Sequence, residues 1–198
     1  MKLRLILASS SARRSAILQQ IGVKFIVKKS NFEEQVQTSE CDEQTVRNLV
    51  LFNARGKAFD VAQSISSGVI IGADTVVYFN NQVLGKPQNA KNAKKMLLQL
   101  GGKKHEVYSG VVVLRKNNEK IQVVSDYVKT DVYMRDYSAK EIDWYVGTKE
   151  PLDKAGSYGV QEKGAVLVEK VEGDFYNVVG LPINKVLELG RSIGVSII

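Results

Sequence analysis

The sequence predicts an α/β protein in which helices flank a mixed, elongated central β-sheet. Strand-like apolar runs alternate irregularly with segments of helical periodicity. Two pairs of strand patterns are joined by Asn-Asn dipeptides, which are typical of hairpin turns. Hairpins between helices favour a mixed sheet over a purely parallel one. At roughly 150 residues per domain, 198 residues predict a single domain spanning positions 1–198.

The first third of the chain predicts two strands and two helices. An apolar run over 3–8 indicates a buried strand, and the polar stretch 9–14 leads into a short helix that ends at Gly22. The inner face of this helix is expected to hold Ala16, Ile17, Leu18 and Ile21. Residues 24–29 predict a second strand. A long helix is expected over 42–66, because its apolar residues keep helical spacing, and Lys57 lies near that apolar face.

The remaining elements include three long strand patterns. The first, over 69–79, is interrupted by Gly72-Ala73-Asp74 and returns through a hairpin at 80–81. After a helix over 89–100, two further strands are expected over 105–115 and 120–135. A capping box at 138–141 opens a helix to about residue 146. The C-terminal part predicts a Gly-punctuated loop over 151–161, a strand over 164–171, a turn at 172–174 and a final helix over 182–191.

Composition excludes several classes of protein. The net charge of +7 favours an anionic partner, but the basic residues are scattered, so no nucleic-acid-binding surface is expected. No segment approaches the ~20 apolar residues of a membrane span, and the short apolar start is a better strand than signal peptide. The single Cys41 excludes an intramolecular disulfide. A cytoplasmic protein without a membrane partner is therefore expected.

The stretch between the first strand and the first helix is a candidate anion site. Its serine hydroxyls, helix N-terminal amides and two arginines can bind phosphate oxygens. A serine helix cap followed by two solvated arginines explains the same pattern equally well.

Three further features are candidates for chemistry. Asp74 interrupts an apolar strand, where a carboxylate is costly unless it is paired, metal-bound or exposed to a cleft; a partnered structural Asp at a β-bulge is the alternative. Lys57 and Lys86 are the second feature, although either could be a solvated surface lysine. The third is the loop 151–161, which is either functional or a packed connector. His105, the only histidine, lies in a strand pattern and is expected to be structural.

Taken together, these stretches resemble the Maf family of nucleoside triphosphate pyrophosphatases. The matching segments occur in family order over essentially the whole chain. They are 7–14 (LASSSARR), 33–34 (EE), 71–77 (IGADTVV), 84–87 (LGKP), 105–111 (HEVYSGV), 151–161 and 179–182 (VGLP). Ala12 stands where the family usually has Pro, and Ser109 where it usually has Thr.

The resemblance implies a fold with two lobes around an active-site cleft and hydrolysis of a nucleoside triphosphate to a monophosphate and pyrophosphate. It implies Asp74 as the general base and a divalent cation, Mg²⁺ or Mn²⁺, held by Glu34 or its neighbour Glu33. A hard cation prefers such oxygen ligands. The triphosphate is expected near a set of basic and hydroxyl groups, which are Lys57, Lys86, Ser9, Ser11, Arg13 and Arg14.

The resemblance also separates two subfamilies. In the one that acts on dTTP and UTP, the specificity positions carry Arg, Thr and Gln. Their matches here are Arg13 or Arg14, Thr75 and Gln161, so pyrimidine nucleotides, ordinary or modified, are the expected substrates. A 7-methyl-GTP pyrophosphatase and a non-catalytic nucleotide-binding regulator of septum formation are the alternatives. Family members are often dimers, so a homodimer is an open possibility, although no exposed apolar stripe in the sequence establishes one.

Overall fold

The structure is a computed structural model that describes residues 4–198, and these residues form a seven-stranded mixed sheet. The strand order is β2-β1-β3-β5-β6-β7, with β4 paired to β3 outside this path. β1 lies parallel to both β2 and β3, whereas β3, β5, β6 and β7 pair antiparallel. The strands are β1 (Leu5–Leu7), β2 (Ile26–Val27), β3 (Ser67–Phe79), β4 (Gln82–Leu84), β5 (Lys104–Asn117), β6 (Lys120–Met134) and β7 (Val168–Glu172). The expected mixed sheet is confirmed.

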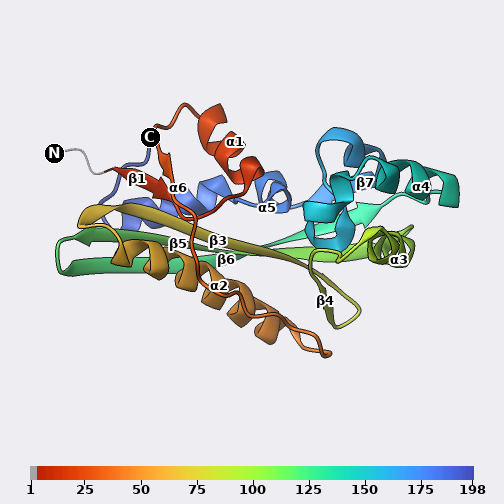
Figure 1. Ribbon diagram of the computed structural model, residues 1–198, viewed down its shortest axis with the longest axis horizontal. Coiled ribbons are helices and arrows are strands. Elements are labelled where there is room, and N and C mark those ends of the chain that lie inside the picture. Colours follow the sequence, from red (N-terminus) through yellow and green to blue (C-terminus); the bar gives the residue numbers. More distant parts are fainter. Residues whose placement is uncertain (1–3) are drawn as a thin grey trace.

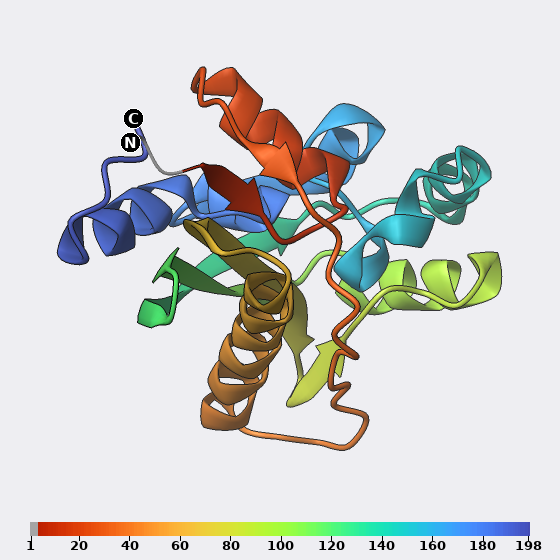
Figure 2. The same ribbon diagram turned by 60° about the vertical axis from the view of Figure 1, so that its left-hand side comes forward.

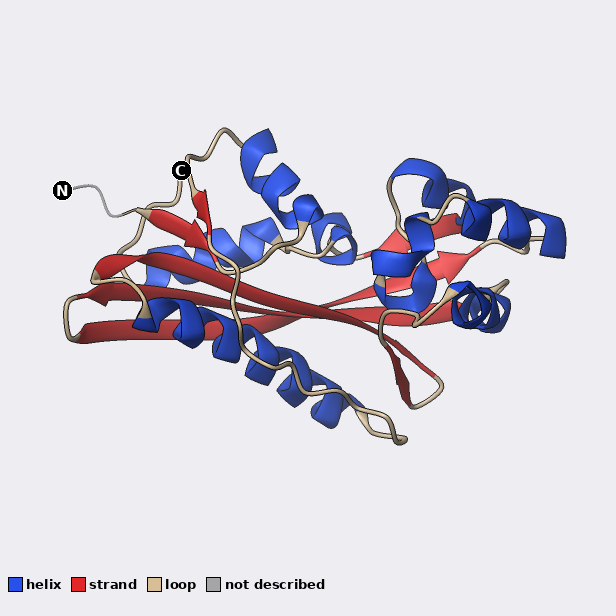
Figure 3. Cartoon of the chain, in the orientation of Figure 1, coloured by secondary structure: helices blue, strands red, loops and turns tan. Residues whose placement is uncertain are grey.

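Helices cover both faces of this sheet (Figures 1, 2 and 3). They are α1 (Ala12–Gln20), α2 (Glu43–Gln63), α3 (Ala90–Leu100), α4 (Ala139–Gly147), α5 (Phe175–Val179) and α6 (Ile183–Ser192). α2 lies along one face. On the other face, α1, α5 and α6 pack over one end of the long strands, and α3 and α4 pack over the other end. Each of these two groups buries its own apolar cluster, which corresponds to the two expected lobes.

Two glycines let α2 lie unusually close to the sheet. A Cβ atom at Gly72 of β3 would meet the backbone oxygen of Ala54 at 2.3 Å, and one at Gly110 of β5 would meet that of Val50 at 2.4 Å. Any side chain at these positions would therefore push the helix away. The close approach places the polar residues in the middle of α2 within reach of β3.

The edge of β3 is open in its middle, among the residues that the structure describes. On one side of the strand, β1 pairs with residues 69–71 and β4 with residues 77–79. Residues 72–76 between them pair only with β5, on the other side. Successive side chains of a strand point to opposite faces. This gap therefore exposes one edge of the strand where Asp74 points toward α2 and Thr75 points toward the opposite face.

Several predicted details are wrong. β3 continues through Gly72-Ala73-Asp74 without a break or bulge, because Asp74 keeps its place in the ladder opposite Gly110. Ala16 and Ile21 are exposed rather than buried, since α1 packs mainly through Ile17 and Leu18.

The boundaries of some shorter elements also differ from expectation. The strand expected over 164–171 begins only at Val168, after a 3₁₀ turn, and the strand expected over 24–29 is limited to Ile26–Val27. The short helix α5 was not predicted. The first position of the strand expected over 3–8 lies outside the described residues. Within them, no helix has both the length and the apolar content needed to cross a lipid bilayer.

Candidate active site

A cavity of about 880 Å³ opens at the gap in the edge of β3. Its walls come from the start of α1, the segment before α2, the middle of α2, β3, the β4–α3 connection, the loop 153–162 and the end of α5. The predicted site residues that line it are Ser9, Ser11, Arg13, Arg14, Glu34, Lys57, Asp74, Thr75, Lys86 and Gln161. Of the predicted set, Glu33 is exposed and lies outside this lining.

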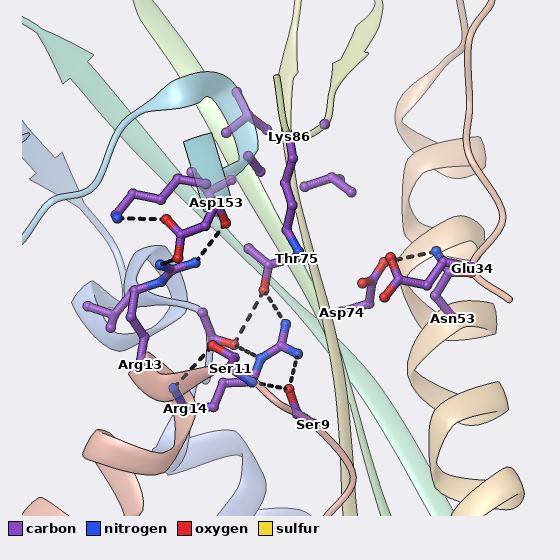
Figure 4. A pocket seen from close by; sticks show the side chains of 18 of the residues that line it. Ser9, Ser11, Arg13, Arg14, Glu34, Asn53, Asp74, Thr75, Lys86 and Asp153 are labelled. Atoms are coloured by element: carbon purple, nitrogen blue, oxygen red, sulfur yellow. Dashed lines mark hydrogen bonds and ion pairs between the residues drawn. The ribbon is translucent and has the colours of Figure 1, made fainter. Parts of the chain in front are cut away.

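Asp74 is buried against α2 and is held at both carboxylate oxygens. Figure 4 shows its side chain close to those of Asn53 and Glu34. Lys57 Nζ lies 2.7 Å from Asp74 Oδ1, and Asn53 Nδ2 donates to Asp74 Oδ2 at 2.9 Å. Lys57 also lies 2.7 Å from Glu34 Oε1, so one ammonium group joins the two carboxylates. These partners compensate the cost of placing a charge in an apolar strand.

Glu34 enters this cluster from the segment that precedes α2. Partial burial acts to raise the pKa of Glu34, but the hydrogen bond and charge of Lys57, helped by Lys86 and Arg14, hold it below its usual value. Its carboxylate is thus ionised at neutral pH while about half of the side chain stays exposed. The described residues contain no cluster of three or more His, Cys, Asp or Glu side chains that could hold a metal ion. Glu34 and Asp74 form a pair of carboxylates on the cavity wall.

On the opposite face of β3, the side chain of Arg14 forms three hydrogen bonds. Its Nε donates to the Gly180 carbonyl at 2.8 Å, Nη1 to Ser9 Oγ at 3.1 Å and Nη2 to Thr75 Oγ1 at 3.3 Å. Burial lowers the pKa of Arg14, although the charges of Asp74 and Glu34 act against this effect. Ser11 caps α1 by accepting from the Arg14 backbone N–H. The guanidinium group therefore joins α1, β3 and the end of α5 at the cavity wall.

Arg13, which also lines the cavity, is more exposed than Arg14. Its Nη1 is 2.7 Å from Asp153 Oδ2, and its Nη2 donates to the Asp153 carbonyl at 3.2 Å. Asp153 also lies 2.8 Å from Lys154 Nζ. The first turn of α1 is thereby linked to the loop 151–161, a contact between residues 140 positions apart.

Lys86 and Gln161 complete the lining from two neighbouring loops. Lys86 is exposed, and no ion pair involves it within the described part of the chain. Its amine points into the cavity in Figure 4. The Gly156 N–H donates to the Gly85 carbonyl at 3.1 Å, so the loop that carries Gln161 is attached to the residue before Lys86.

Three lining side chains that hydrogen-bond within the site, those of Asn53, Asp153 and Lys154, were not singled out from the sequence. Asn53 lies one helical turn before Lys57, on the face of α2 that packs on the sheet. A polar residue at this spacing from Lys57 on an apolar helix face could have indicated Asn53 as a site residue. Asp153 and Lys154 lie in the loop that was recognised only as a whole. No pattern in the sequence indicates that they pair with each other and with Arg13.

The fold and the cavity define an α/β protein with a cationic pocket suited to a phosphorylated ligand. A family model described as Maf-like protein matches residues 4–193. The chain belongs to the Maf family, as its sequence motifs predicted.

Curated relatives match over nearly the whole chain. A protein of Dictyoglomus thermophilum is 44% identical over all of both chains. One from Methanosarcina mazei is 45% identical over 98% of this chain and 96% of its own. One from Bacillus cereus strain AH820 is 43% identical over 93% of this chain and 92% of its own. Each of the three is named dTTP/UTP pyrophosphatase.

Proposed function

We propose that this protein is a nucleoside triphosphate pyrophosphatase that hydrolyses dTTP and UTP to the monophosphate and pyrophosphate. The observation that carries the proposal is the full-length similarity to relatives named for that activity. The cavity supports it, because six cationic side chains line it against four carboxylates; the cations are Arg13, Arg14, Lys29, Lys57, Lys86 and Lys154. A triphosphate with about four negative charges needs such an environment.

Asp74 is the general base in this proposal. It accepts a proton from the attacking water as the new phosphorus–oxygen bond forms and the α–β anhydride bond breaks. Pyrophosphate then leaves with the bridging oxygen. Both carboxylate oxygens of Asp74 are oriented by hydrogen bonds, from Lys57 and Asn53, so the base is held in place before the substrate binds.

Glu34 is the group that would hold a divalent cation, since its carboxylate lies on the cavity wall and half of its side chain is exposed. One carboxylate fits Mg²⁺ or Mn²⁺, because a hard cation in a nucleotide site is commonly bound by one or two carboxylates together with substrate phosphates. When bound, the cation neutralises charge on the phosphates and stabilises the leaving pyrophosphate. Glu33 lies outside the cavity lining, so we assign the metal role to Glu34.

The two arginines have different roles in this proposal. The donors of Arg14 are directed to Gly180, Ser9 and Thr75, so Arg14 shapes the pocket wall. Among the described residues, the side chain of Arg13 is held by the exposed Asp153 alone, and it can exchange this partner for a phosphate.

The other lining residues divide between phosphate binding and base recognition. Lys86 and the hydroxyls of Ser9 and Ser11 bind phosphate oxygens. Thr75 and Gln161 contact the pyrimidine, ordinary or modified.

We further propose that residues 1–198 act as a single domain in the cytoplasm, where nucleoside triphosphates are made and a free thiol such as Cys41 persists. A homodimer is compatible with this proposal. A regulator of septum formation would use the same nucleotide pocket but would not need Asp74 as a base. A 7-methyl-GTP pyrophosphatase would use the same chemistry with a purine base.

The test is pyrophosphate release from a panel of nucleoside triphosphates with Mg²⁺ or Mn²⁺, for the wild type and Asp74→Asn. We expect turnover of dTTP and UTP that falls by at least about 10³-fold in the variant, while dTTP binding measured by calorimetry stays within about threefold. A preference for 7-methyl-GTP would support the proposed reaction but contradict the assignment of dTTP and UTP as substrates. Binding without turnover in the wild type would favour the regulator.

A further inference from the structure

The segment that carries Glu34 lies along α2 and is attached to it at several points. Asp60 Oδ2 accepts from Ser30 Oγ at 2.9 Å and from the Asn31 N–H at 2.8 Å. Further along, the ring of Phe32 covers Gly56, where a Cβ atom would come within 2.3 Å of it. Figure 3 shows this part of the chain as a loop running beside the helix. The segment is therefore fixed to α2 before it reaches the cavity.

The attachment nearest the cavity is made by Asn53, a residue that is only 2% exposed. Its Oδ1 accepts from the Gln35 N–H at 2.9 Å, and its Nδ2 donates to the Gln35 carbonyl at 3.0 Å. The same Nδ2 donates to Asp74 Oδ2 at 2.9 Å. One carboxamide thus joins the backbone next to Glu34 to the carboxylate of Asp74.

We propose that Asn53 is a positioning residue that sets the distance and orientation between the Glu34 and Asp74 carboxylates. This inference rests on the proposed function of those two groups. Asn53 hydrogen-bonds the backbone beside Glu34 and an oxygen of Asp74, whereas the hydrogen bonds of Asp60 among the described residues go to the segment alone. The ammonium of Lys57 lies between the two carboxylates and attracts both. An ammonium group has little directional preference, so it cannot by itself fix their orientation.

The chemistry of a carboxamide matches this position. Gln35 requires an acceptor for its N–H and a donor for its carbonyl, and Asp74 requires a donor. Asparagine supplies both without adding charge. Leucine has a similar volume but leaves the buried groups unpaired. Aspartate keeps an acceptor for the Gln35 N–H but places a second carboxylate against Asp74.

The experiment compares Asn53→Leu and Asn53→Asp with the matched control Asp60→Ala, which loosens the same segment at its other end. For both Asn53 variants we expect kcat for dTTP to fall about 30-fold, the loss that follows from removing a hydrogen bond to a charged group. Metal-free dTTP binding, measured by calorimetry, should stay within about threefold, because Asn53 is not assigned to the phosphates. Asp60→Ala should keep kcat within about threefold.

Hydrogen–deuterium exchange gives a readout independent of activity. Protection of the Gln35 amide should be lost in Asn53→Leu but kept in Asn53→Asp and in Asp60→Ala. Any one of three results overturns the inference. Asn53→Leu keeps the wild-type kcat, or Asn53→Leu keeps the protection of the Gln35 amide, or Asp60→Ala loses as much kcat as the Asn53 variants. If wild-type protein has no turnover, the proposed function fails, and the exchange pattern alone then decides whether Asn53 holds the segment.

Discussion

His105 shows how a single buried side chain connects the sheet to the substrate loop. Its imidazole is 2% exposed, and Nε2 lies 2.6 Å from the hydroxyl of Tyr158, three residues before Gln161. Nδ1 is buried without a partner among the described residues. Burial lowers the pKa of His105 to about 4, with the charge of Asp131 acting in the opposite direction. The imidazole is therefore neutral at neutral pH, consistent with a structural role.

This environment predicts a loss of stability on acidification. The pKa of His105 falls from an ordinary value of 6.5 to about 4 on folding, so between these values the unfolded chain binds more protons than the folded one. Stability must then decrease as the pH falls through this window. From pH 7.5 to pH 5.0 we expect His105 to account for a loss of about 2 kcal/mol in the free energy of unfolding, measured by urea denaturation.

Other groups also titrate in this range, so the variant His105→Gln isolates the contribution. Glutamine offers the Tyr158 hydroxyl an amide but has no titrating group. The variant should lose about 2 kcal/mol less than the wild type over the same pH interval. An identical pH dependence in the two proteins would show that His105 is not the group responsible.

At the scale of the element, α2 determines where the Glu34 segment lies, and Gly56 is the position that tests this. Alanine is favoured over glycine inside a helix by about 1 kcal/mol. At Gly56, however, the added Cβ would come within 2.3 Å of the Phe32 ring. Displacing that ring costs about 1–3 kcal/mol. We expect Gly56→Ala to lower the free energy of unfolding by about 1 kcal/mol and to reduce kcat/KM for dTTP by more than about threefold.

Gly147, at the end of α4, is the matched control. Outside its own helix and chain neighbours, no atom of the described residues lies within 4 Å of a Cβ atom built there, so Gly147→Ala should leave both stability and kcat/KM unchanged or raise stability slightly. Chemical denaturation and steady-state kinetics on both variants decide the matter. A Gly56→Ala protein that is more stable than the wild type and fully active would contradict the packing of Phe32 on α2.

Elements with strong local signals were predictable from the sequence, and elements that depend on distant contacts were not. The capping box at 138–141 and the hairpin at 117–118 are local, and the structure has both. The expected break in β3 is wrong, because Gly72 serves close packing of α2 and the charge of Asp74 is compensated by Lys57 and Asn53 on that helix. The five-residue α5 is too short for periodicity to reveal, since it provides little more than one turn.

The candidate site was predictable to a similar degree. The family motifs identified its residues, because they occur in order along the chain, and the structure brings all of the set except Glu33 to one cavity. Strand alternation predicts that Asp74 and Thr75 lie on opposite faces of β3. The link between Arg13 and Asp153 could not be predicted, because it joins residues 140 positions apart through tertiary structure alone.

At the scale of the whole molecule, the net charge of +7 and the cationic cavity act together on a polyanionic substrate. Attraction of this kind raises the rate of association and is screened by salt, with a Debye length of about 10 Å at 0.1 M and about 3 Å at 1 M. Raising NaCl from about 0.05 M to 0.5 M should therefore lower kcat/KM for dTTP about tenfold, mainly through KM. Steady-state kinetics at fixed free metal concentration measures the effect.

Two comparisons separate this field effect from a general effect of salt on the protein. Thymidine carries no phosphate, so its inhibition constant against dTTP should change by less than about twofold over the same range. Lys86→Gln removes an exposed cation from the cavity wall and should weaken the dependence of KM on salt. A KM that does not respond to salt would mean that the positive charge of the chain does not attract the substrate from solution. The cationic side chains of the cavity would then contact the phosphates only after the nucleotide has bound.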